Sequence, residues 1–441
     1  MPDDSTSMPL LVHSEPSSIQ PERAMNYIKT RDDNHVACFA TKAGTPEEKE
    51  FEFIPPVPET MNSLQDGSGK PAWIDKTSFG QKELRQRIEP WLTALFQSEH
   101  LSLLVGSGMT HAVHCLAQGK PATGMRRAEF PQEAFGDKIK AYADHSATEC
   151  GRKVANFEDD IRVANELLQG MKISGCDKAG CLEAELTNFL KKFADGILAS
   201  EQGIASAEAG KREDALGSLV NFLMSFASRT GTRDRLNIFT TNYDRLIEAG
   251  AELAGLHLVD RFVGNLAPIF RSSRLDIDMH YNPPGIRGEP RYLEGVARFT
   301  KLHGSVDWIQ AEDDIRRIGL PFGARSVSPY LDAPGMEGAK ENHLMIYPNS
   351  SKDIETSMYP YVELFRDFAS ALCRPNSTLV TYGYSFGDEH INRVIRDMLT
   401  IPSTHLVVIS RDDKLNRISA LLKKTGRLPQ ISLLVGPELA D

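Results

Sequence analysis

The chain has 441 residues, of which 41% are hydrophobic and 25% charged, and its formal net charge is −10. At about 150 residues per domain this leaves room for two or three domains, and the composition excludes a disordered or collagen-like protein. The acidic balance disfavours nucleic-acid binding over the whole surface, and no segment approaches about 18 consecutive apolar residues, so we expect neither direct nucleic-acid binding nor a membrane span.

The first 80 residues are expected to form an irregular N-terminal segment. Residues 1–20 are polar and lack the apolar core of a signal peptide, and Pro55, Pro56 and Pro58 interrupt the stretch that follows. The 6 cysteines are scattered and form no C-x-x-C pair, which disfavours a zinc ribbon and fits a reducing compartment. We therefore expect a cytoplasmic protein without bound zinc or another metal.

The first strand–helix unit is predicted just after this segment. Residues 79–99 carry apolar side chains at helical spacing, which predicts a helix. Leu101 to Val105 is a short apolar run that ends in Gly106-Ser107-Gly108, a pattern typical of a buried parallel strand entering a glycine turn. Residues 109–117 then predict the following helix.

Residues 130–230 are predicted to be a helical insertion. Strand signals disappear there, and apolar stripes recur at helical spacing over residues 154–168, 182–197 and 216–226. We expect about four helices packed over one end of a sheet. Their outer faces are expected to pair with copies of the same chain. The alternative is that the helices cap the cleft within a monomer.

An alternation of strands and helices returns after the insertion. Strands are predicted at 236–240, 299–302, 344–347, 378–382, 405–409 and 431–435, and helices at 243–253, 358–372, 387–399 and 412–424. This order predicts an α/β fold with an open, doubly wound, Rossmann-like parallel sheet. The sheet is expected to belong to one domain, residues 81–441, which the helical block interrupts.

Four polar or glycine-rich segments each follow a predicted strand. They are Gly106 to Thr110, Thr240 to Asp244, Lys301 to Ser305, and Gly383 to Asp388. In an open α/β sheet, ligands bind beyond the carboxyl ends of the strands. We therefore expect all four segments to line one cleft.

Each segment by itself also has an ordinary structural explanation. The first has only two glycines of the dinucleotide-binding pattern, because His111 stands at the third, and it also fits a plain tight turn. Asn242 and Asp244 are residue types that commonly cap helices, and a lone histidine such as His303 is more often structural than catalytic. The late segment, 383–388, also fits a plain strand–helix loop.

Taken together, the motifs resemble a known family. GSG at 106–108, TTNYD at 240–244, KLHGS at 301–305 and GYSFGD at 383–388 occur in the order found in the sirtuin (SIR2) family. The chain resembles more closely the SIR2-like NAD-cleaving proteins of bacterial anti-phage defence. The resemblance covers roughly residues 100–130 and 235–440, and it implies a Rossmann-like NAD-binding domain.

The resemblance implies which residues hold the nucleotide. Gly106, Ser107 and Gly108 stand where the family's glycine turn holds the NAD pyrophosphate. Gly383 and Ser385 match the loop that holds the adenosine half. NAD is thereby implied as the substrate.

The resemblance also implies which residues act at the reacting end. Asn242 matches the asparagine that orders the nicotinamide ribose or a water near it, and His303 matches the catalytic base on the ribose hydroxyls. Asp244 matches the carboxylate that binds the nicotinamide amide. These matches make Asn242 and His303 the expected catalytic residues.

Departures from the family bear on the reaction. Only Cys373 follows His303, so the four zinc-binding cysteines of lysine deacylases are absent, and Thr241 replaces the usual glutamine. Protein deacylation is therefore the least favoured activity. The expected activity is NAD⁺ glycohydrolysis, which gives nicotinamide and ADP-ribose. The alternative is a non-enzymatic subunit that binds NAD or ADP-ribose within a larger assembly.

An unregulated NAD⁺ hydrolase would drain its own cell, so the resemblance also implies control by a trigger. We expect a homo-oligomer that acts in antiviral defence and that a separate sensor chain activates. In the resembling systems this chain is a HerA-type ATPase or helicase, an Argonaute or a phage protein, and the sequence does not select among them.

Overall fold

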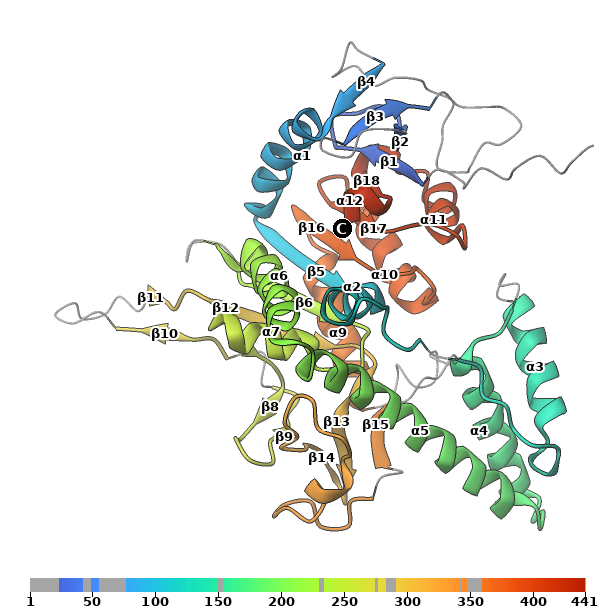
Figure 1. Cartoon of the computed structure of the whole chain (residues 1–441). Helices are drawn as coiled ribbons and strands as arrows, with labels where there is room; N and C mark the ends of the chain where they lie inside the picture. The colour runs from blue at the N-terminus through green and yellow to red at the C-terminus, as the bar shows by residue number, and fades with distance from the viewer. Residues whose placement is uncertain are drawn as a thin grey trace, which may run out of the picture.

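An 11-stranded sheet runs through the molecule in the strand order β4-β3-β2-β1-β18-β17-β16-β5-β6-β12-β7 (Figure 1). The structure is a computed structural model, and it describes residues 24–42, 49–54, 77–124, 126–149, 154–229, 234–273, 277–282, 291–340, 343–346 and 359–440. No helix in these ranges is both long and apolar enough to cross a bilayer.

In the part of the sheet that runs from β18 to β7, each strand is parallel to the next. These strands are β5 (His100–Val105), β6 (Leu236–Thr240), β7 (His257–Val259), β12 (Val296–Lys301), β16 (Ser377–Tyr382), β17 (His405–Ser410) and β18 (Ile431–Val435). Strands covered on both faces read as short apolar runs. The predicted α/β fold with a Rossmann-like parallel sheet is confirmed.

Helices cover both faces of the parallel strands. On one face lie α1 (Gln81–Phe96), α2 (Ser107–Gln118), α6 (Ala209–Ala227) and α7 (Leu246–Ala254), and on the other α9 (Tyr361–Leu372), α10 (Glu389–Leu399) and α11 (Arg417–Thr425). Successive side chains of β5 point to opposite faces of the sheet. Leu103 packs in the core beneath α1, α2, α6 and α7, and Leu104 packs in the core beneath α9, α10 and α11.

The order of the parallel strands reverses beside β5. From β5 the sheet grows through β6 and β12 on one side and through β16, β17 and β18 on the other. Ligands of doubly wound sheets bind at such a switch point, outside the carboxyl ends of the strands. The crevice above β5 and β16 is therefore the place where the fold favours a ligand.

Where the structure describes it, the N-terminal segment is not irregular, in contrast to our expectation. Four short strands, β1 (Met25–Lys29), β2 (Ala37–Thr41), β3 (Glu50–Phe53) and β4 (Ser78–Gly80), extend the sheet as an antiparallel ribbon, with β1 paired to β18. The rings of Phe39, Phe51 and Phe79 pack with centroids 5.3–5.5 Å apart. Strands this short carry little periodicity, and residues 55–76, which include the three prolines, lie outside the described ranges.

The helical block contributes to three cores, and in one of them Ala194 and Leu198 pack with Val306 and Ile309. The block contains α3 (Gly136–Glu149), α4 (Phe157–Ile173), α5 (Ala179–Ala205) and α6. Leu219 and Leu223 of α6 pack in the same core as β5 and β6, whereas α3, α4 and the first half of α5 share a separate core beside the sheet (Figure 1). The expectation that the whole block packs over one end of the sheet is therefore wrong, because only α6 and the end of α5 reach it.

A smaller antiparallel sheet follows β12. It contains β8 (Phe262–Val263), β9 (Ile269–Phe270), β13 (Gly304–Ala311), β14 (Asp314–Arg317) and β15 (Leu344–Ile346). The strand predicted at 344–347 belongs to this sheet and not to the parallel one, because β15 pairs with β13. His303 lies in the turn that joins the two sheets, between β12 and β13.

Candidate functional site

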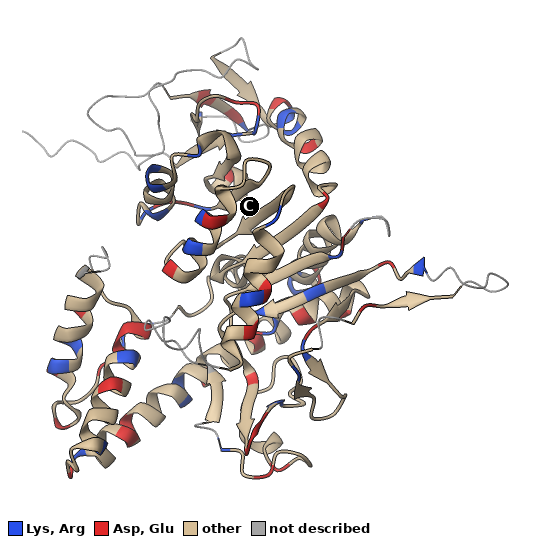
Figure 2. Ribbon diagram, turned by 180° about the vertical axis from the view of Figure 1, so that it is seen from behind, with Lys and Arg blue, Asp and Glu red and all other residues tan. Residues whose placement is uncertain are grey.

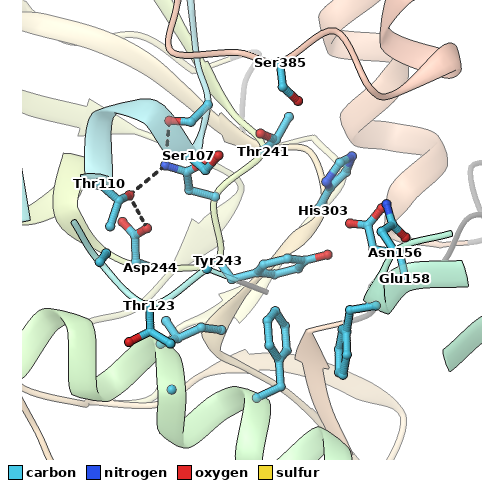
Figure 3. A pocket seen from close by; sticks show the side chains of 18 of the residues that line it. Ser107, Thr110, Thr123, Asn156, Glu158, Thr241, Tyr243, Asp244, His303 and Ser385 are labelled. Carbon is cyan, nitrogen blue, oxygen red and sulfur yellow. Dashed lines mark hydrogen bonds between the residues drawn. The ribbon is translucent and has the colours of Figure 1, made fainter. Parts of the chain in front are cut away.

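A cavity of about 560 Å³ opens at the carboxyl ends of β5, β6, β12 and β16. Its volume lies within the range of small-molecule and cofactor sites. Predicted site residues that line it are Gly106, Ser107, Asn242, Asp244, His303 and Ser385. Figure 3 shows Ser107, Asp244, His303 and Ser385 around it. The expectation that the four segments converge on one cleft is confirmed.

The N terminus of α2 opens onto this cavity. Gly106 is the N-cap residue and Ser107 the first residue of the helix, and both line the cavity. The first N–H groups of a helix have no intrahelical partner, and the helix dipole adds positive potential there. This end of α2 is therefore suited to bind a phosphate or diphosphate through the helix dipole and the N–H of Ser107, since the N–H groups of Gly108 and Met109 already donate to the carbonyl oxygens of Gly383 and Gly106.

Gly108 and Gly383 lie behind the lining and hold two loops together. The N–H of Gly108 donates to the carbonyl oxygen of Gly383 at 3.0 Å, and a Cβ at position 108 would lie 2.5 Å from the Cα of Gly383. Gly383 also has a φ of +60°, which favours glycine. The structure thus gives both residues a packing role and places neither on the cavity wall.

Asn242 is anchored through its amide nitrogen. Nδ2 donates to the carbonyl oxygen of Gly106 and to Oγ1 of Thr110, each at 3.1 Å. A backbone carbonyl can only accept, so the atom facing Gly106 is the nitrogen, and the side-chain oxygen of Asn242 is the atom left to act on a ligand. Asn242 is not a helix cap, because α7 begins only at Leu246.

Asp244 joins the same network through Thr110. Its Oδ2 accepts from the Thr110 hydroxyl at 2.7 Å, and its Oδ1 accepts from the N–H of Leu246 at 3.1 Å. Asp244 therefore accepts from the first residue of α7 and also lines the cavity (Figure 3). Sequence reasoning missed Thr110, although its place one turn into the helix after the glycine motif points it back toward the glycine turn.

His303 is paired with a carboxylate from a distant segment. Its Nε2 lies 2.8 Å from Oδ2 of Asp388, and the two residues are 9% and 8% exposed. The other oxygen of Asp388 accepts from the N–H of His390, which makes Asp388 the N-cap of α10. The sequence carried no sign of the pairing of Asp388 with His303.

The helical insertion supplies the opposite wall, with Arg127 just before it. The lining residues of the insertion include Asn156, Glu158, Phe189, Lys192 and Phe193. Phe193 packs edge-on against Tyr243, with ring centroids 5.5 Å apart. Hydrogen bonds from Arg127 to Asp160 and Asp144 hold the pKa of Arg127 above its usual range and fix its guanidinium in place.

His111 stands on the cavity wall at the position of the missing third glycine. Burial, followed by the neighbouring His114, lowers the pKa of His111, which keeps its imidazole uncharged at neutral pH. In the part of the chain that the structure describes, no group of three or more His, Cys, Asp or Glu side chains is arranged to hold a metal ion.

Comparison with known proteins agrees with this geometry. Residues 236–428 match the family model of the SIR2-like domain. The matched range holds Asn242, Asp244, His303 and Ser385, whereas the glycine turn at 106–108 and the helical insertion precede it. No curated protein matches the chain significantly. The SIR2-like domain defines an NAD-dependent enzyme family, so the match supports an NAD-related activity.

Proposed function

We propose that the chain is an NAD⁺ glycohydrolase that cleaves the nicotinamide–ribose bond. The observation that carries this proposal is the convergence of Asn242, Asp244 and His303 on one cavity beside the N terminus of α2. The SIR2-like match includes all three of these residues and supports the same reading.

The cavity offers a place for each part of the substrate. The N terminus of α2 at Gly106 and Ser107 is suited to the diphosphate. Ser385 and Arg417 line the side suited to the adenosine half, and the Arg417 Nη1 lies 3.5 Å from the Ser385 Oγ. The nicotinamide end then faces Asn242 and Asp244.

The reaction needs positioning more than covalent catalysis. Nicotinamide leaves with the electron pair of the C–N bond, water adds its oxygen to the ribose carbon, and one proton is released. The bond breaks through an oxocarbenium-like state, as in other glycoside hydrolyses. The Asn242 side-chain oxygen orders the ribose or the attacking water, and His303 acts as the base on the ribose hydroxyls.

Substituting the two catalytic residues tests the proposal. We expect Asn242→Ala and His303→Ala each to lower NAD⁺ turnover by about 10² to 10⁴ fold, the usual contribution of a positioned acid–base group. Nicotinamide and ADP-ribose are separated by chromatography and quantified. The matched controls are Asn221→Ala and His257→Ala, which change the same residue types at exposed positions.

The outcomes separate the candidate functions. Unchanged turnover in both site variants would remove the catalytic assignment. A wild-type chain that binds ADP-ribose in calorimetry, yet consumes no NAD⁺ with or without its genomic neighbour's product, would favour the non-enzymatic binding subunit. Release of acetyl groups from a lysine peptide would favour the deacylase.

We further propose that the enzyme is a homo-oligomer of the cytoplasm that serves antiviral defence. A separate chain, such as a HerA-type ATPase, would switch it on, because constant hydrolysis would exhaust the NAD pool. Exposed apolar side chains on and beside the insertion helices are where we expect the copies to meet: Tyr142 is 57% exposed, Val154 63% and Ile173 87%.

A further inference from the structure

The loop between β16 and α10 holds Asp388 firmly in place. The Tyr384 hydroxyl donates to the carbonyl oxygen of Asp388 at 3.3 Å and to Oδ1 of Asn392 at 3.1 Å. Nδ2 of Asn392 donates to the carbonyl oxygen of Phe386 at 3.0 Å, and Phe386 has a φ of +52°. A non-glycine residue at positive φ persists only where its surroundings determine it.

A helix cap alone does not account for this carboxylate. An N-cap needs one acceptor oxygen, which serine, threonine or asparagine supplies as well as aspartate. The second oxygen of Asp388 is aimed at His303 Nε2 instead, at 2.8 Å. Both side chains are buried, and a buried carboxylate is costly unless it is paired.

We propose that Asp388 is a positioning residue for His303. A carboxylate can only accept, so it fixes the proton of the neutral imidazole on Nε2 and makes Nδ1 the nitrogen that accepts a proton. The same contact sets the orientation of the ring, as the carboxylate does in catalytic triads. The inference rests on the proposed function, because it assigns to His303 the role of the base.

The ring of Tyr243 flanks the imidazole on another side. Its centroid lies 6.3 Å from that of His303, at an interplanar angle of 39°. The Tyr243 carbonyl oxygen accepts from the N–H of Val306 and the hydroxyl of Ser305, which ties it to β13. His303 thus has two neighbours from distant segments, a carboxylate from the late loop and an aromatic ring from the TTNYD segment.

Asp388→Asn separates capping from positioning. The asparagine oxygen still accepts from the N–H of His390, so the N-cap is kept. The amide NH₂ group then faces Nε2 of His303, which must become an acceptor. The proton moves to Nδ1, and the base is lost. We expect kcat to fall by about 10² to 10⁴ fold, as for loss of a general base, with KM for NAD⁺ and ADP-ribose affinity unchanged.

Two further variants serve as controls. Asp388→Ser keeps a capping oxygen but removes the partner of His303, and we expect a similar fall in kcat. Asp413→Asn makes the same change at a carboxylate that accepts from the N–H groups of Ile418 and Ser419 beside α11. It should leave kcat unchanged, because Asp413 does not line the cavity.

A spectroscopic readout separates this inference from the proposed function. Nitrogen-15 NMR of histidine-labelled protein, with the His303 signal assigned from His303→Asn, should show the proton on Nε2 in the wild type and on Nδ1 in Asp388→Asn. This result would support the pairing even for a chain without NAD⁺ cleavage, which would contradict only the proposed function. Unchanged kcat in an active Asp388→Asn enzyme, or the same tautomer in both proteins, would overturn the inference. A fall in kcat that is accompanied by a loss of ADP-ribose affinity and a lower melting temperature would assign Asp388 to holding the loop together and overturn it as well.

Discussion

At the scale of single residues, the site depends on which atom of each side chain is already engaged. The side-chain amide of Asn242 donates to the carbonyl oxygen of Gly106 and to the hydroxyl of Thr110. That hydroxyl in turn donates to Asp244. Gly108 and Gly383 permit these contacts because they let two loops approach at backbone distance. The site is therefore preorganised by hydrogen bonds formed without substrate.

His405 provides a pH-dependent contribution to stability. It is buried in β17 beside Ser432, and burial, followed by Arg31 and Lys29, lowers its pKa from 6.5 to about 4. Below pH 6.5 His405 is mostly protonated in the unfolded chain, whereas in the folded chain it stays neutral until about pH 4. The free energy of unfolding therefore falls with falling pH, by about 2 kcal/mol between pH 6.5 and pH 5.

The measurement is urea unfolding of the wild type and of His405→Gln, which cannot titrate. We expect the stability difference between them to shrink by that amount from about pH 6.5 to pH 5. His257→Gln, at an exposed position, should show no such change. A constant difference across this range would mean that His405 takes up its proton equally in both states.

At the scale of elements, α5 connects the insertion to the site. Near its end, Glu201 accepts from the backbone N–H of Arg245 at 2.8 Å and from its guanidinium. Arg245 follows Asp244 directly and also donates to the carbonyl oxygens of Leu320 and Pro321. This buried ion pair joins α5, the TTNYD loop and the segment after β14.

Removing one partner of this pair should be costly. Glu201→Ala leaves the Arg245 charge buried and uncompensated, and such losses destabilise by about 3 to 5 kcal/mol. The control is Glu183→Ala in the same helix, which breaks an exposed ion pair with Lys172 that is expected to contribute about 0 to 1 kcal/mol. Urea unfolding measures both. Equal losses in the two variants would contradict a structural role for the Glu201–Arg245 pair.

At the scale of the whole molecule, the walls of the cavity come from two parts of the chain, the sheet and the helical insertion. The strand ends supply Asn242, Asp244 and His303, and the insertion supplies Phe189 and Phe193. Acidic and basic residues are interspersed along the insertion helices (Figure 2). A partner or second copy that contacts the insertion would therefore act on a wall of the site itself, which is a physical basis for the proposed control by assembly.

An exposed residue of the insertion offers a test of that control. We expect Ile173→Glu to shift the chain to smaller species in light scattering and to lower triggered NAD⁺ turnover, because it places a charge on a surface proposed to self-associate. Leu415→Glu makes the same change at another exposed position, in the segment before α11, and should alter neither. A wild-type monomer that is fully active by itself would contradict both assembly and triggering.

The sequence by itself determined the parallel sheet and the position of most site residues. Apolar runs such as residues 101–105 and 236–240 record burial on both faces, and burial leaves a local pattern. Because the carboxyl ends of parallel strands share one edge, the residues that follow them were predicted to meet. Asn242 and His303 could be placed in this way without any knowledge of their partners.

Only the tertiary structure decided what those residues contact. The pairing of His303 with Asp388 and the wall contributed by α5 join segments far apart in the chain, and such contacts leave no trace in local periodicity. The same holds for β1 to β4, whose short strands are stabilised by pairing with one another, by the pairing of β1 with β18 and by packed phenylalanine rings. Local patterns report whether a residue is buried, whereas its partner is set by how distant segments pack.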